Sequence, residues 1–219
     1  MHGERLLSYH HLKMKVEALL AFSLCFAHFG VGSQNVLNGD PATVLDADGN
    51  QYRVIRIGKQ LWMAENLRVT RAADGGAVIR HDPNNDPAQT AVYGGLYDWK
   101  DALKVGPSGW RLPSDAEWTA LESGLAATPA GGVKDHAYWK SKEDHGPEPA
   151  SFQIRPAGYW NDQGFDNYFG SRAVFWTATP KDAHFVWSRV VGENSNELRR
   201  AEQHPQYGFS VRCVASTEA

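Results

Sequence analysis

The sequence is poor in cysteine, in basic charge and in long apolar runs. Only two of its 219 residues are cysteine, Cys25 and Cys213, which excludes a dense disulfide framework and a cysteine-ligated zinc site. The formal net charge is −3, without the basic surplus that marks a nucleic-acid-binding surface. One apolar run, residues 18–27, is too short to cross a bilayer, and no second run is long enough for a transmembrane helix.

That apolar run has the setting of a secretory signal peptide. Lys13 and Lys15 precede it, and residues 31–33 (Val-Gly-Ser) offer small side chains for a signal peptidase. We therefore expect residues 1–33 to be a signal peptide and the mature protein to be secreted or displayed at the cell surface.

The true start is expected at Met14, with residues 1–13 as an extension that has no signal character. A lipid anchor on Cys25 is disfavoured, because Leu24 in front of it is not small and Phe26 continues the apolar run. Cleavage near Ser33 would remove one cysteine and leave the other unpaired.

The remaining chain predicts a mixed α+β fold with small antiparallel sheets, one or two helices and long loops. Residues 43–58 are two strand-like runs around an Asp-Gly-Asn turn, which indicates a hairpin. Residues 70–90 are rich in Ala, Gly, Asp, Asn and Pro and predict an irregular loop. Five short strand-like runs after residue 151, four of them aromatic, predict a late antiparallel sheet: FQIRPAGYW, AVFWTAT, HFVWSRVV, NELRRAEQ and YGFSVRCVA.

Two short motifs could carry chemistry but have simpler structural interpretations. Asp46, Asp48 and Asn50 resemble the start of a calcium loop, yet Ile57 stands where the ligating Glu should be, so a hairpin turn is favoured. Ser114 lies near carboxylates, as a hydrolase nucleophile could. However, it follows Leu-Pro and precedes Glu117 by three residues, which favours a capping box and a helix over 115–125.

The segment GYWNDQGFDN offers the one candidate ligand site. An aromatic platform and nearby oxygen donors suit a sugar or a calcium ion, although Asn, Asp and Gly suit a turn equally well, and the turn is favoured. The candidate ligand-binding residues are Trp160, Asn161, Asp162 and Asp166.

We predict neither a metal site nor a cofactor. The histidines after the signal peptide have no zinc-type spacing and are expected on the surface or in loops; they are His81, His136, His145, His184 and His204. The sequence also has neither a Gly-rich phosphate loop nor a dinucleotide fingerprint.

Cys213 could be a nucleophile, half of a disulfide or a small buried apolar residue. In the strand-like run FSVRCV it shares one face with Phe209 and Val211. Because that face is apolar and a nucleophilic thiol needs a base and a polar setting, a packed thiol is favoured.

Several blocks in their order resemble the Fibrobacter succinogenes major paralogous (FISUMP) domain over roughly residues 43–215. They are DADGNQYRVIRIGKQLWMAENLRVT, YGGLYDWKDAL, GPSGWRLPSDAEWTAL, RPAGYW, FWTAT and YGFSVRCV. That family occurs in exported and surface proteins of Bacteroidetes and Fibrobacteres, and its biochemical function is largely unassigned. The resemblance implies one domain over 43–215, which follows the expected signal peptide (1–33) and a linker over 34–42.

The blocks GWRLPSDAEW and GFSVRCV are also similar to formylglycine-generating (sulfatase-modifying) proteins, which implies a C-type-lectin-like fold. The FISUMP family often has a cysteine just before its Pro-x-Gly-Trp block, where this chain has Gly106. The bridge implied for Cys213 therefore cannot form. The enzymes among the formylglycine-generating proteins use cysteines for copper-dependent oxidation, and without a second cysteine this activity is not expected.

The preferred hypothesis is an exported, non-catalytic interaction module that binds a glycan or a surface protein through the Trp160–Asp166 loop. One alternative is an enzyme related to the sulfatase-modifying proteins or a hydrolase. Another is a structural component of a surface assembly. We expect no nucleic acid among the partners of the protein and no membrane-spanning segment in the mature chain.

Overall fold

The structure is a computed structural model that describes residues 36–37, 40–41, 43–126, 134–140, 152–161, 163, 166–195 and 197–215. These residues belong to one compact unit that spans 35–219. The expected signal peptide lies outside the described residues. In the described ranges no helix is long and apolar enough to cross a membrane.

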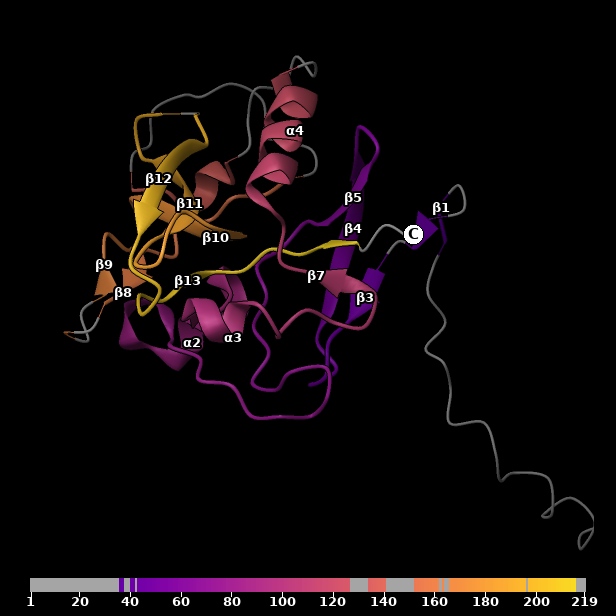
Figure 1. Cartoon of the computed structure of the whole chain (residues 1–219), viewed down its shortest axis with the longest axis horizontal. Helices are drawn as coiled ribbons and strands as arrows, with labels where there is room; N and C mark the ends of the chain where they lie inside the picture. Colours follow the sequence, from indigo (N-terminus) through magenta and orange to yellow (C-terminus); the bar gives the residue numbers. More distant parts are fainter. Residues whose placement is uncertain are drawn as a thin grey trace, which may run out of the picture. The chain divides into compact units, whose positions relative to one another are not determined.

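The first sheet joins the early hairpin to the end of the chain. Its strands follow the order β3-β4-β5-β14-β7, and each neighbouring pair is antiparallel (Figure 1). The expected hairpin is confirmed, and Asp46 Oδ1 accepts the backbone N–H groups of Asp48 and Asn50 in its turn. The strand bounds are β3 Thr43–Leu45, β4 Gln51–Ile57, β5 Gln60–Met63, β7 Trp110–Arg111 and β14 Val214–Ala215.

The second sheet has the order β12-β11-β10-β13-β6. The late runs form an antiparallel β10-β11-β12 ribbon as expected, but β13 lies parallel to β10, with Phe175 opposite Ser210. The purely antiparallel expectation is therefore wrong at this strand. The bounds are β6 Leu96–Tyr97, β10 Arg172–Pro180, β11 Val186–Gly192, β12 Arg199–Gln203 and β13 Phe209–Ser210.

Two further strand pairs are short. Strands β1 (Val36–Leu37) and β2 (Asp40–Pro41) pair within the stretch expected to be a linker. Strands β8 (Tyr159–Trp160) and β9 (Asp166–Asn167) pair around the predicted ligand-binding loop.

Helix α4 (Asp115–Ala126) begins at the predicted capping box. The Glu117 N–H donates to Ser114 Oγ at 3.2 Å, and the Ser114 N–H donates to Glu117 Oε2 at 2.8 Å. The two side chains thus satisfy backbone N–H groups that a helix start leaves without partners.

The prediction of an irregular loop over 70–90 is wrong for the C-terminal part of this range. There the chain forms the 3₁₀ turn η1 (Pro83–Asn85) and helix α2 (Pro87–Tyr93). Asp86 caps α2 by accepting the Ala88 N–H, and Pro87 occupies the first turn, where its missing N–H costs nothing. The other short helices are α3 (Trp99–Ala102) and η2 (His136–Tyr138).

Aromatic side chains fill the core, as the eight tryptophans suggest. Trp62 and Trp118 are fully buried with their ring centroids 5.0 Å apart, and Phe152 packs against both rings. Trp176 of β10 packs against Phe209 of the neighbouring strand β13, with their ring centroids 4.3 Å apart. The described part of the chain is thus an α+β fold of small, mainly antiparallel sheets with few helices, as predicted.

Candidate functional site

Trp160 lies at a junction of three segments. It pairs with Asp166 in β9, and its backbone exchanges two hydrogen bonds with Gly208, at 3.0 and 2.9 Å. The His81 ring stacks on the indole, with the centroids 3.8 Å apart and an interplanar angle of 7°. One face of the predicted platform is therefore occupied by another side chain of the protein.

Gly208 packs closely against this stack. A Cβ atom at position 208 would lie 3.0 Å from Trp160 Cβ and 3.5 Å from His81 Cδ2. Burial lowers the pKa of His81, and nearby Asp98 and Asp82 only partly oppose this. The imidazole is therefore neutral at pH 7 and packs as a flat, half-buried ring.

The other predicted residues give less support to a ligand role at this loop. The Asn161 side-chain oxygen accepts the Gln163 N–H at 3.1 Å, which is the turn that the Asn-Asp-Gly composition favours. Asp162 lies outside the described residues, as does the side chain of Asp166. Trp160 and Asn161 are both half-buried.

The opposite side of β8 carries a row of tyrosines that the sequence analysis did not single out. Successive strand residues point to opposite faces, so Tyr159 lies on the face away from Trp160. Its ring is 6.0 Å from Tyr168, at an interplanar angle of 24°, and 6.3 Å from Tyr207, at 22°. We call Tyr159, Tyr168 and Tyr207 the tyrosine row.

The row packs on a buried phenylalanine, and its most exposed ring lies against an arginine. Buried Phe209 meets the rings of Tyr159 and Tyr207 edge-on, at 5.9 and 6.2 Å. Tyr168 is 52% exposed, and the Arg172 guanidinium lies 4.0 Å from its ring centroid. Burial raises the pKa of Tyr159, so its hydroxyl stays protonated at neutral pH and can both donate and accept hydrogen bonds. The row thus combines apolar ring faces with neutral polar edges.

No local sequence signal could have identified this row. Its members come from β8, from the turn after β9 and from the turn before β13. Only the pairing of β8 with β9 and of Trp160 with Gly208 brings these segments together. Tyr168 also adopts a φ of 65°, which is uncommon for a residue other than glycine and which composition alone does not reveal.

Cys213 is a packed thiol, as predicted. It is fully buried and free, and burial raises its pKa to about 12. At Gly106, where a family bridge would begin, an added Cβ would lie 2.5 Å from the Trp110 carbonyl oxygen. This loop conformation therefore has no room for a cysteine without a shift of the backbone.

The carboxylates of the two other motifs have structural partners. Asp46 Oδ2 accepts the Tyr52 hydroxyl at 2.6 Å, and Glu117 accepts two hydrogen bonds from Arg111, at 2.7 and 2.8 Å. Within the described ranges, no group of three or more His, Cys, Asp or Glu side chains is placed to hold a metal ion.

The family model of the Fibrobacter succinogenes major domain matches residues 55–215, most of the chain. The chain belongs to this family. The FISUMP resemblance is thereby confirmed, and the tyrosine row, Cys213 and Gly106 all lie inside the matched part of the FISUMP domain. No curated protein and no solved structure matches the chain. The similarity to formylglycine-generating proteins and the C-type-lectin-like fold therefore stay predictions.

Proposed function

We propose that the chain is an exported, non-catalytic binding module whose tyrosine row recognises a glycan. The observation that carries this proposal is the near-parallel arrangement of Tyr159, Tyr168 and Tyr207 around a buried Phe209. Aromatic rings bury a large apolar area while the tyrosine hydroxyl remains available for hydrogen bonds. A sugar ring offers the matching surfaces, with an apolar C–H face and a polar rim.

The surroundings of the row support a preformed binding surface. Phe209 is buried against Trp176, so the ring beneath the row cannot move aside without disturbing the core. Tyrosine side chains that are already held in place lose little conformational entropy when a ligand binds. The proposal of a non-catalytic role is supported by Cys213, since its buried, protonated thiol is unsuited to act as a nucleophile.

A glycan array followed by calorimetry with the best glycan tests the proposal. The double substitution Tyr168→Ala and Tyr207→Ala removes two rings of the row and should weaken affinity at least tenfold, or about 1.4 kcal/mol. Phe185→Ala is the matched control, because Phe185 is an exposed aromatic residue (37%) outside the row. Its affinity should stay within twofold of the parent protein.

Two outcomes would contradict the proposal. One is an array without any bound glycan, and the other is equal affinity for the double variant and the control when both retain the parent melting temperature. Trp160→Ala with Asp162→Ala, assayed with and without calcium, tests the loop predicted from the sequence. A loss confined to that variant would move the site to the Trp160 side of β8.

Export is tested separately by sequencing the N-terminus of protein recovered from outside the cytoplasm of a bacterial host. The expected first residue lies close to Gln34, because the small residues at 31–33 precede it. A recovered chain that begins at Met1 or Met14 would argue against cleavage.

A further inference from the structure

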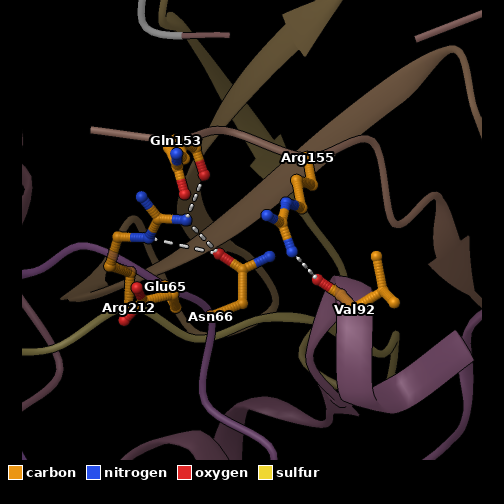
Figure 2. A pocket seen from close by; sticks show the side chains of 6 residues that line it. All are labelled: Glu65, Asn66, Val92, Gln153, Arg155 and Arg212. Atoms are coloured by element: carbon orange, nitrogen blue, oxygen red, sulfur yellow. Dashed lines mark hydrogen bonds between the residues drawn. The ribbon is translucent and has the colours of Figure 1, made fainter. Parts of the chain in front are cut away.

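A small pocket, lined mainly by polar and charged residues, lies where four segments of the chain meet, and it shares no residue with the tyrosine row. Figure 2 shows its lining, with the guanidinium groups of Arg212 and Arg155 on either side of Asn66. The pocket is small, with room for about one water-sized particle. The lining residues are Glu65, Asn66, Val92, Gln153, Arg155 and Arg212.

Arg212 is the unusual member of this set. It is only 1% exposed, yet no carboxylate of the described residues forms an ion pair with it. Its Nε and Nη2 donate to Asn66 Oδ1, at 3.1 and 2.6 Å, and Nη2 also donates to the Gln153 carbonyl oxygen at 2.9 Å. Its Nη1 is buried without a hydrogen-bond partner among the described residues.

The acidic groups near Arg212 are already bonded to other arginines. Both oxygens of Glu65 accept from Arg53, at 2.6 Å from Nε and 2.7 Å from the backbone N–H. Asp135 accepts from Arg155 Nε at 2.8 Å. Around the pocket, three arginines therefore face two carboxylates, which leaves one positive charge in excess.

Arg212 does not remove this excess charge by losing its proton. Burial lowers the pKa of Arg212 to about 9, and the neighbouring Arg155 and Arg53 add to this while Glu65 opposes it. A pKa of about 9 still leaves the guanidinium charged at pH 7. A buried charge without a counter-ion is costly, so the pocket favours an anion over a neutral water molecule.

We propose that this pocket binds one small monovalent anion of the size of chloride between the guanidinium groups of Arg212 and Arg155. The anion would neutralise the positive charge that Glu65 and Asp135 leave uncompensated. Because Arg212 follows β13, Asn66 follows β5 and Val92 lies in α2, one ion would hold together segments from both sheets and a helix.

Bromide is the probe for a direct test. Crystals of the unmodified protein grown in sodium bromide should show an anomalous peak in the pocket between Arg212 and Arg155. A water molecule there without anomalous signal would overturn the proposal. This measurement needs no variant, so it remains decisive even if changes at Arg212 or Arg155 prevent folding.

The melting temperature gives a second test. At equal ionic strength, the melting temperature should be higher in sodium chloride than in sodium gluconate, because gluconate is too large for the pocket. The expected rise is about 2–4 °C when chloride is about five times its dissociation constant. Arg155→Gln should abolish this difference.

Arg80→Gln is the matched control for Arg155→Gln. Both arginines are 22% exposed in their side chains, and each donates once to an aspartate and once to a backbone carbonyl. Arg80 does not line the pocket. General effects of chloride and gluconate on stability act on both variants. The proposal would be overturned if the melting temperatures in the two salts differed by the same amount for Arg155→Gln and Arg80→Gln.

Discussion

At the scale of single residues, the thiol of Cys213 should react slowly in the folded protein. Burial raises its pKa from 9.0 to about 12, so the thiolate fraction near pH 8 falls about 1,000-fold, and the side chain is also out of reach of a reagent. Labelling with a maleimide, followed by mass spectrometry, should be slow in buffer and fast in denaturant. Similar rates in both conditions would mean that Cys213 is accessible and would reopen a catalytic role.

The same shift predicts a loss of stability at alkaline pH. The unfolded chain releases the Cys213 proton near pH 9, whereas the folded chain holds it until about pH 12. This contribution is therefore complete below pH 9 and is lost as the pH rises, at about 1.4 kcal/mol per pH unit relative to Cys213→Ala. Urea unfolding of both proteins between pH 8 and 11 measures the difference. A constant difference across this range would contradict the assignment of a buried, protonated thiol.

At the scale of elements, the contribution of the α4 capping box to stability can be tested with a single substitution. Ser114→Ala removes the acceptor of the Glu117 N–H and should lower the free energy of unfolding by about 1 kcal/mol. Ser123→Ala is the control, since Ser123 is exposed inside the same helix and caps nothing. Equal unfolding free energies for the two variants would show that the box contributes little.

Local patterns predicted some elements and not others. The β3–β4 hairpin and α4 carry their signals within a few neighbouring residues, namely an Asp-Gly-Asn turn and the Ser114–Glu117 pair. Helix α2 was missed because its composition is typical of loops, although Asp86 followed by Pro87 is a helix-start signal that could have shown it. The parallel contact of β13 with β10 depends on segments more than 30 residues apart, which no local pattern encodes.

The candidate site was predictable only in part, for the same reason. Aromatic and turn residues in the sequence indicate the segment around β8, and the structure places Trp160 in this strand next to Tyr159 of the tyrosine row. Which face of β8 is open depends on His81 and Tyr207, which reach it from elsewhere in the chain. The excess charge at Arg212 likewise emerges only when Arg53 and Arg155 are placed around it.

At the scale of the whole molecule, seven residues near the C-terminus join the two sheets. Ser210 of β13 pairs with Leu96 and lies opposite Phe175 in the second sheet, while Val214 of β14 pairs with Trp62 and Arg111 in the first. Only three residues, 211–213, separate these strands. The sheets should therefore unfold in one cooperative transition, because neither can keep its C-terminal strand when the other opens.

Val214→Asp tests this coupling. Val214 is buried between β5 and β7, so an aspartate there would place an unpaired charge in the core and should cost more than about 3 kcal/mol of unfolding free energy. The neighbouring Ala215→Asp is the control, because Ala215 is half-buried and should cost clearly less. Circular dichroism and tryptophan fluorescence, recorded on the same denaturant series, should report coincident transitions in every variant. Two separate transitions in Val214→Asp, one for each sheet, would show that residues 209–215 do not couple the sheets.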